Sequence, residues 1–249
     1  SMTATHKELT VMFCDMRGFT SLSERMEPVQ LQELLNAVFN RLTDIIRANR
    51  GTIDKYMGDC VMAFWGAPVD TANHAHLAVK SALEMTEAVG RINEDHRANG
   101  LPEIGVGIGL NTGVMCVGDM GSQVRRSYTV IGDAVNLGSR LEGLSKVYGV
   151  DIVTSESTRK LAPAFAWQEL DRVRVKGREQ AVGIFWPLAP ADRLGKDQAG
   201  ELRAWNAFLR AYRAQDWDEC EVLLLNLQRM DPHKYLYELY SERVASMKQ

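Results

Sequence analysis

The segment LTVMFCDMRGFT, residues 9–20, decides the fold of this 249-residue chain and points to its chemistry. Its first half, Leu9–Cys14, is short, apolar and rich in β-formers, so it predicts a buried strand. The strand ends at Asp15, beside a small loop that leads into a helix. Backbone N–H groups in such a loop can hold a phosphate, although Asp15 taken alone is equally well explained as a helix cap.

Helices and strands alternate after this segment. Apolar residues recur at the helical period over residues 31–46, and Gly51 is expected to close that helix. Residues 52–56 and 61–65 flank a turn and predict a hairpin. A second long helix is predicted at 72–97, followed by strands at 104–110 and 114–117. This βαββαβ order predicts an α+β domain with a ferredoxin-like core.

The rest of the chain divides into three parts. Further strands are predicted at 128–131, 152–153, 167–175 and 183–186, with a helix at 134–148, so the first domain is expected to span residues 1–187. Residues 188–200 are rich in helix breakers and predict a linker. Three amphipathic helices are predicted in residues 201–249, at 202–215, 218–230 and 234–247. This helical tail weakly resembles a tetratricopeptide unit, but a tail packed on the main domain or on a partner is the simpler interpretation.

Charge and hydropathy exclude some functions. The formal net charge is −3, which gives no reason to expect nucleic-acid binding. No apolar run approaches the roughly 20 residues of a membrane helix, so we expect no membrane insertion of this fragment. The four cysteines form no CxxC pair and are expected to be buried thiols in the reducing cytoplasm. The opening Ser1-Met2 is typical of an expression scar, so we expect an upstream sensory region, through which the full-length protein could be tethered to a membrane.

A second carboxylate, Asp59, lies in the predicted hairpin turn, within the segment DKYMGD at residues 54–59. If the hairpin and the first strand are neighbours in one sheet, this turn brings Asp59 beside Asp15. Two carboxylates with phosphate oxygens and water suit Mg²⁺, which takes few protein ligands. Two bridged ions would clamp the attacking and leaving oxygens of an in-line displacement. Aspartates in turns are common, so it is the pair that favours a metal site.

Four sequence motifs occur in order, FCDMRGFT at 13–20, KYMGD at 55–59, YTVIGDAVNLGSRLE at 128–142 and VKG at 175–177. Through these motifs the chain resembles the class III nucleotidyl cyclases, the family of adenylate and guanylate cyclases. Together the motifs cover roughly residues 8–187, and four motifs in order are far more specific than one. Thr129 places the chain in the threonine-bearing subgroup of bacterial adenylate cyclases. Gly138 stands where many relatives carry alanine, which would loosen its helix by up to about 1 kcal/mol.

The resemblance implies a role for each matching residue. The residues implied to hold two ions, Mg²⁺ or Mn²⁺, are Asp15, Asp59 and the carbonyl of Met16. The residues implied to hold the triphosphate are Gly18, Phe19, Thr20, Lys176 and Arg125, the last in competition with Arg126. The residues implied to act on the ribose and the transition state are Asn136 and Arg140. No general base is evident, and Asp15 is the candidate.

Lys55 and Thr129 match the base-selecting pair of the family, and their chemistry fits adenine. A lysine ammonium can only donate, so Lys55 suits adenine N1 and clashes with the N1–H of guanine. The Thr129 hydroxyl can accept from the adenine amino group. Without the motif, Lys55 would be an ordinary solvated lysine and Thr129 an ordinary β-former. Asn136 and Arg140 are spaced i,i+4 and share a helical face, which a surface Asn and Arg would also do.

The resemblance therefore implies an adenylate cyclase that converts ATP to 3′,5′-cyclic AMP and pyrophosphate. In that family the metal carboxylates and the base-selecting residues of one site come from different subunits. This chain carries both sets, so we expect a homodimer with two complete sites at its interface. The alternatives are a guanylate cyclase, which Lys55 and Thr129 disfavour, and a catalytically silent nucleotide-binding regulatory module, which the intact Asp15, Asp59, Asn136 and Arg140 disfavour.

Overall fold

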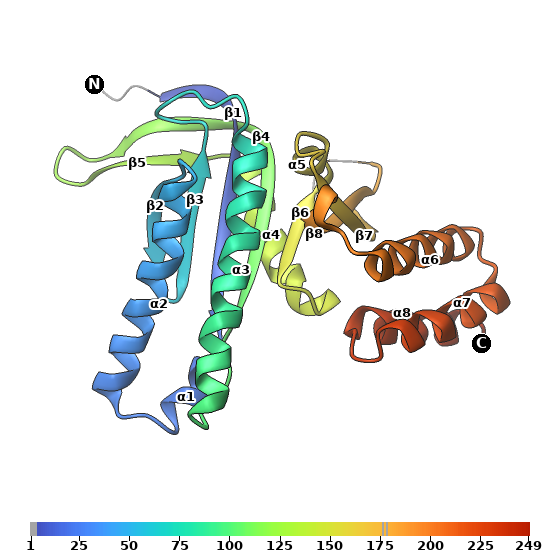
Figure 1. Cartoon of the computed structure of the whole chain (residues 1–249). Helices are drawn as coiled ribbons and strands as arrows, with labels where there is room; N and C mark the ends of the chain where they lie inside the picture. The colour runs from blue at the N-terminus through green and yellow to red at the C-terminus, as the bar shows by residue number, and fades with distance from the viewer. Residues whose placement is uncertain (1–3, 176, 178) are drawn as a thin grey trace.

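The computed structural model describes residues 4–175, 177 and 179–249, and in this part of the chain eight strands form one sheet (Figure 1). The order is β2-β3-β1-β4-β6-β8-β7, with β5 paired to β4. The strands are β1 (Ala4–Arg17), β2 (Thr52–Met57), β3 (Cys60–Trp65), β4 (Gly105–Gly121), β5 (Arg126–Ile131), β6 (Ile152–Ser155), β7 (Phe165–Val173) and β8 (Val182–Pro190). The antiparallel order β2-β3-β1-β4 is that of a ferredoxin-like core, which confirms the predicted α+β fold.

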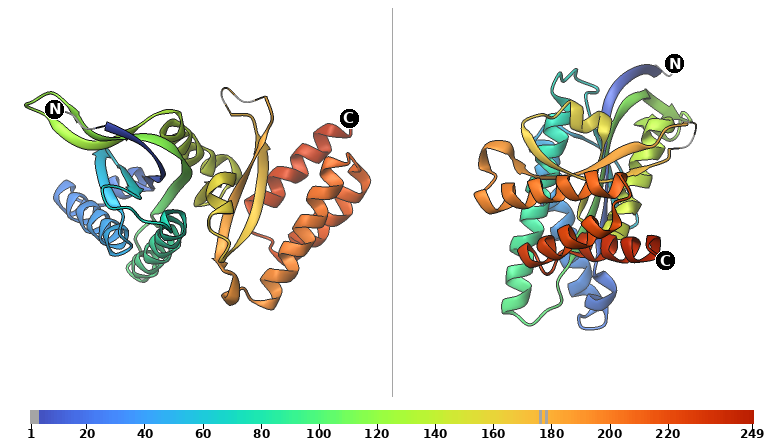
Figure 2. Two further views of the ribbon diagram at one scale, coloured as in Figure 1. Left: turned by 90° about the horizontal axis from the view of Figure 1, so that it is seen from above. Right: turned by 90° about the vertical axis from the view of Figure 1, so that its right-hand side faces the viewer.

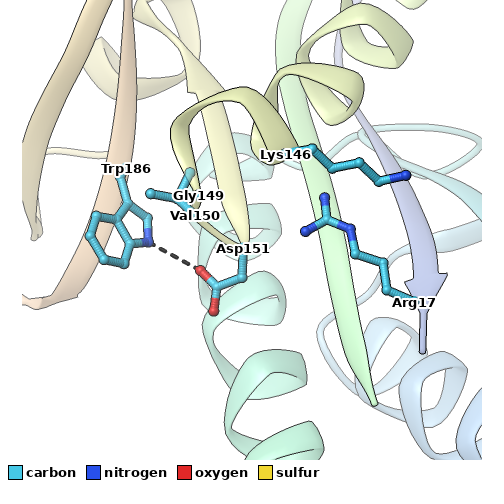
Figure 3. A pocket seen from close by; sticks show the side chains of 6 residues that line it. All are labelled: Arg17, Lys146, Gly149, Val150, Asp151 and Trp186. Carbon is cyan, nitrogen blue, oxygen red and sulfur yellow. Dashed lines mark hydrogen bonds between the residues drawn. The ribbon is translucent and has the colours of Figure 1, made fainter. Parts of the chain in front are cut away.

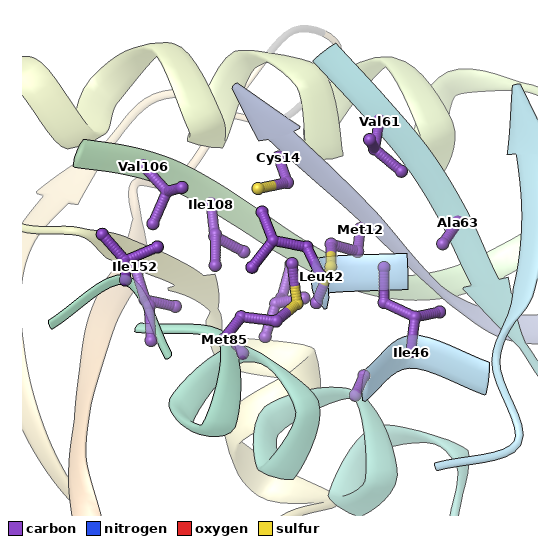
Figure 4. Packing of buried hydrophobic residues seen from close by; sticks show 14 of the residues in the cluster. Met12, Cys14, Leu42, Ile46, Val61, Ala63, Met85, Val106, Ile108 and Ile152 are labelled. Atoms are coloured by element: carbon purple, nitrogen blue, oxygen red, sulfur yellow. The ribbon is translucent and has the colours of Figure 1, made fainter. Parts of the chain in front are cut away.

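Helices cover both faces of this core. On one face lie α2 (Pro28–Ala48) and α3 (His74–Ala98), and a short helix, α1 (Phe19–Ser23), joins β1 to α2. Met12 and Cys14 of β1 point into the core beneath α2 and α3 (Figure 4). Val11 and Phe13 belong to a separate cluster on the opposite face, beneath α4 (Asp133–Tyr148). Because strand side chains alternate, Asp15 lies on the α4 face with these two residues.

Glycines let α4 lie directly on the sheet. A Cβ added to Gly138 would meet Val11 Cγ1 at 2.8 Å and the Phe13 ring at 3.3 Å. A Cβ added to Gly109 would meet the Gly138 carbonyl oxygen at 2.5 Å. Gly138 therefore does more than weaken a helix, because its missing side chain sets how closely α4 approaches β1 and β4.

The prediction that Gly51 closes the first long helix is wrong. The helix ends at Ala48, and the left-handed conformation falls on Arg50, whose φ is 70°, rather than on Gly51. The Arg50 and Gly51 N–H groups bond the carbonyls of Arg47 and Ile46 at 2.9 Å each, which is a Schellman motif. Gly51 is required for packing, because its Cβ would lie within 2.8 Å of Ile46 and Trp65 side-chain atoms.

The two strands predicted at 104–110 and 114–117 are one continuous strand, β4. The polar residues between them, Asn111 and Thr112, stay in register opposite Val11 and Thr10 of β1. Their side chains are buried and hydrogen-bonded, so the polar interruption does not break the strand. The β4–β5 hairpin extends past β2, the edge strand of the sheet (Figures 1 and 2).

The linker predicted at 188–200 is also wrong, because this segment is largely ordered. Strand β8 runs to Pro190, a 3₁₀ turn spans Ala191–Arg193, and α6 (Lys196–Arg213) begins within the predicted linker. Strand β6 bonds β8 only at Ile184 and Phe185, so the rest of β8 has one strand neighbour, and such strands tolerate proline.

The three C-terminal helices pack against the sheet domain. Helices α6, α7 (Trp217–Met230) and α8 (Tyr235–Met247) lie beside β7 and β8 (Figures 1 and 2). The buried Trp205 and Tyr240 share a hydrophobic cluster with Leu141 of α4 and Leu170 of β7. Trp205 Nε1 donates to the Glu169 carbonyl at 2.7 Å. Among the described residues, no helix is both long and apolar enough to span a bilayer.

Candidate active site

Asp15 and Asp59 lie together at one end of β1. Asp15 is paired with Cys60 across the β1–β3 ladder, and the Met16 N–H donates to the Asp59 carbonyl at 3.1 Å. Burial, followed by the nearby charge of Asp59, raises the pKa of the Asp15 carboxyl. The hairpin turn therefore brings the two predicted carboxylates side by side.

This pair fits a hard divalent cation. Within residues 4–175, 177 and 179–249, no group of three or more His, Cys, Asp and Glu side chains is arranged to hold a metal. A cation on Asp15 and Asp59 would complete its shell with backbone carbonyls, water or phosphate oxygens, as Mg²⁺ commonly does. Two like charges held close in a partly buried place also favour a bound cation that neutralises them.

Three charged residues that the sequence did not single out surround the pair. Glu142 of α4 lies near it, because burial and then the charge of Asp15 raise the pKa of the Glu142 carboxyl. The positive charges of Lys146 and Arg17 act in the opposite direction on Asp15. Lys146 comes from α4, so no local sequence pattern could have placed it beside Asp15.

Arg17 also borders a cavity of about 490 Å³ (Figure 3). Its guanidinium passes over Gly107 and donates to Ser145 Oγ of α4. The far wall is formed by Trp186, whose Nε1 donates to Asp151 Oδ1 at 3.1 Å. Arg17 thus ties the end of β1 to the last turns of α4, next to the carboxylates.

Lys55 and Thr129 both lie against Asp54, a residue to which the sequence assigned no role. Thr129 Oγ1 donates to Asp54 Oδ2 at 2.6 Å, and the Val130 N–H approaches the same oxygen at 3.4 Å. Lys55 Nζ lies 3.6 Å from Asp54 Oδ1. The acidic neighbour of Lys55 was visible in the sequence, but regular strand alternation would point it to the opposite face.

Asn136 and Arg140 line a second cavity, of about 890 Å³, between α4 and the segment after β7. The Arg140 Nη1 donates to the Arg174 carbonyl at 2.8 Å. A helix turns about 100° per residue, so Arg140 lies roughly 200° around α4 from Glu142. Glu142 faces the carboxylate pair, so Arg140 faces away from the pair of its own chain.

The residues implied to hold the triphosphate are spread more widely. Gly18 has a φ of 91° and precedes α1, where Phe19 and Thr20 begin the first turn directly after the Asp15 strand. A Cβ on Gly18 would meet the Glu103 carbonyl oxygen at 2.7 Å, so only glycine fits. Arg125 lies in the exposed turn of the β4–β5 hairpin, and its competitor Arg126 begins β5. Lys176 lies outside the described residues.

Comparison with known proteins identifies the family of the chain. The model of the adenylate and guanylate cyclase catalytic domain matches residues 2–187. An adenylate cyclase of Anabaena cylindrica is 40% identical over 191 residues, which are 73% of this chain and 37% of that protein. The crystal structure of the adenylyl cyclase CyaB from P. aeruginosa is 36% identical with a TM-score of 0.69, covering 78% of this chain and 100% of that one. The guanylyl cyclase Cya2 is 32% identical with a TM-score of 0.65, covering 76% and 95%. The chain, which spans little more than a third of the Anabaena protein, thus belongs to the family of class III adenylate and guanylate cyclase catalytic domains.

Proposed function

We propose that this chain is the catalytic domain of an adenylate cyclase, which converts ATP to 3′,5′-cyclic AMP and pyrophosphate. The observation that carries the proposal is the placement of Lys55 and Thr129 around one buried carboxylate. The ammonium of Lys55 can donate to adenine N1, and the Thr129 hydroxyl can accept from the adenine amino group. A guanine base presents N1–H and a carbonyl at these positions, so it leaves polar groups unpaired, which strongly disfavours the wrong base.

In the reaction, the ribose 3′-hydroxyl loses its proton, for which Asp15 is the candidate acceptor, and its oxygen attacks the α-phosphorus. The bond from that phosphorus to the bridging oxygen breaks, and pyrophosphate leaves. Asp15 and Asp59 would hold two Mg²⁺ or Mn²⁺ ions, and ions bound there would supply positive charge to the 3′-oxygen and the triphosphate. Arg140 is proposed to stabilise the charge that develops on the α-phosphate, and Asn136 to orient the ribose. Gly18, Phe19 and Thr20 follow the metal strand directly, which suits backbone contact with the phosphates, and Arg125 and Lys176 would add positive charge.

We further propose that the active enzyme is a homodimer with shared sites. Arg140 bonds the Arg174 carbonyl on the flank of α4 that faces away from Asp15 and Asp59. A single chain therefore carries both the metal carboxylates and the pair Asn136 and Arg140, but on different sides of α4. A two-fold dimer would set the carboxylates of one chain against the Asn136 and Arg140 of its partner, and would build two such sites. We propose a cytoplasmic location for the catalytic fragment, which is supported by its four free cysteines, since a reducing compartment keeps thiols free.

The test is cyclic nucleotide production by the purified chain with ATP or GTP, in Mg²⁺ or Mn²⁺. We expect cyclic AMP from ATP, a clear preference over GTP, and an activity per chain that rises with protein concentration. Asp59→Asn should abolish turnover, whereas Asp95→Asn, a matched change of an exposed acid on α3, should not. A preference for GTP would make the chain a guanylate cyclase, and tight ATP binding without turnover would make it a regulatory module.

A further inference from the structure

Asp54 is buried between the two residues proposed to read the base. Its side chain is 0% exposed, whereas that of Lys55 is 45% exposed. One carboxylate oxygen, Oδ2, faces the Thr129 hydroxyl and the Val130 N–H. The other, Oδ1, has no hydrogen-bond partner among the described residues and faces the Lys55 ammonium at 3.6 Å. Asp54 thus meets only donors.

A β-bulge puts Asp54 in this position. Ile53 pairs with Ala63 and Lys55 pairs with Met62, so Asp54 is the extra residue of β2. A regular strand points consecutive side chains to opposite faces, whereas a bulge re-aims one of them. Here the bulge lets Asp54 and Lys55, adjacent in sequence, serve the same site. Bulges are common beside functional sites, where they change the direction in which a side chain points.

The Thr129 hydroxyl cannot discriminate between bases by itself. A hydroxyl carries one proton and two lone pairs, and it rotates to suit its partner. It could accept from the amino group at C6 of adenine or donate to the carbonyl at C6 of guanine. Once its proton is committed to Asp54 Oδ2, at 2.6 Å, only lone pairs remain for the base. Donating to guanine instead would leave a buried carboxylate short of a partner, which is costly.

We propose that Asp54 is a specificity-determining residue of this site, which acts through Thr129 by holding its hydroxyl as an acceptor. The proposal rests on the proposed adenylate cyclase function. Asp54 needs no contact with the nucleotide, so it is a positioning residue. The site therefore prefers a purine nucleoside triphosphate with an amino group at C6 and a hydrogen-bond acceptor at N1.

Asp54→Asn tests this inference with little change of shape. The amide can present its NH₂ to Thr129 Oγ1, which frees the hydroxyl proton for the guanine carbonyl. We expect the ratio of kcat/KM for ATP to that for GTP to fall by roughly 10- to 100-fold. Purine riboside triphosphate lacks the C6 substituent, so its kcat/KM should fall much less than that of ATP. A general loss of structure would lower all three substrates alike, and Asp54→Ala provides a second way to free the hydroxyl.

The control for the route through Thr129 is Thr129→Val. In that background Asp54→Asn should leave the ATP to GTP ratio unchanged, since no hydroxyl remains to be oriented. An unchanged ratio in Asp54→Asn and Asp54→Ala alone, with wild-type preference for ATP intact, would overturn the inference and leave the proposed function standing. If the wild-type chain makes no cyclic nucleotide, the proposed function fails separately. In that case the ratio of the affinities for ATP and GTP is measured by competition against a fluorescent ATP analogue. Equal affinity ratios in wild type and variant would refute the role of Asp54.

Discussion

Arg140 donates a hydrogen bond to the Arg174 carbonyl at 2.8 Å, on the opposite flank of α4 from Glu142 and the carboxylate pair. Arg140 and Asp59 of one chain are therefore not partners. We expect Arg140→Ala to lower kcat by about 100- to 1,000-fold, since it removes a charge that stabilises the transition state.

Asp59→Ala and Arg140→Ala chains, each inactive alone, should complement each other when mixed. A mixed dimer has one site with both defects and one with neither. Random exchange gives half mixed dimers, so the mixture should recover about a quarter of wild-type activity. Cyclic AMP production after mixing measures this, and a mixture of two different Asp59 variants is the control. A mixture as inactive as its components would argue for sites formed within one chain.

Asp15→Asn should raise the melting temperature at neutral pH while abolishing activity. The folded-state pKa of Asp15 is raised, by burial first and then by the charge of Asp59, so the folded chain holds the proton more tightly than the unfolded chain. Stability therefore falls as pH rises from the unfolded pKa of about 3.9 through the folded pKa, and the cost is fully present above it.

Thermal unfolding with and without Mg²⁺ checks this prediction. The advantage of Asp15→Asn should shrink as the pH falls toward the unfolded pKa, because the raised pKa of the folded wild-type carboxyl favours its protonation there. Mg²⁺ should raise the melting temperature of the wild type more than that of the variant, because a ligand stabilises only a state that binds it. A variant that is less stable than wild type at pH 7 would contradict the conclusion that burial and the charge of Asp59 make the ionised Asp15 unfavourable.

Trp205→Ala should destabilise the whole chain by about 3–5 kcal/mol, the usual cost of emptying a buried aromatic site. Trp205 is fully buried, stacks on Phe208 and donates to the Glu169 carbonyl of β7. Val222→Ala, on the exposed side of α7, is the control and should cost less than about 0.5 kcal/mol. Urea unfolding followed by tryptophan fluorescence and by cyclase activity measures both, and the two signals should be lost together. Loss of fluorescence with full activity would mean that the tail unfolds by itself.

Gly138→Ala should fail to stabilise the protein, although alanine is worth about 1 kcal/mol in a free helix. The new Cβ would lie 2.8 Å from Val11 Cγ1, and valine side chains are too stiff to move aside. The double variant Val11→Ala/Gly138→Ala removes the clash, so Gly138→Ala should be more favourable in that background. Chemical denaturation of the four proteins gives the coupling, and additivity would show that the contact does not matter.

Local patterns predicted the βαββαβ order of the core elements, because strands and helices each leave a periodic signature. They also indicated that Asp15 and Asp59 would meet if the hairpin lay beside the first strand. They could not predict Asp54, since a bulge changes direction without changing composition. Lys146 lies far from the carboxylates in sequence and reaches them from α4, so only the tertiary structure places it there. The segment 188–200 was predicted to be a linker because it contains helix breakers, a proline among them. Proline interrupts a strand that has two neighbours, but the end of β8 has only one strand neighbour and accommodates it.

The β2–β3 hairpin carries both Lys55 and Asp59, four residues apart. In the proposed dimer these two residues belong to different active sites, so each hairpin serves one nucleotide with its lysine and the other with its carboxylate. A nucleotide bound in one site would then contact the hairpin that also carries a residue of the other site. The two sites would form one kinetic unit, in which the affinity for the second ATP depends on the first and the same coupling holds in reverse.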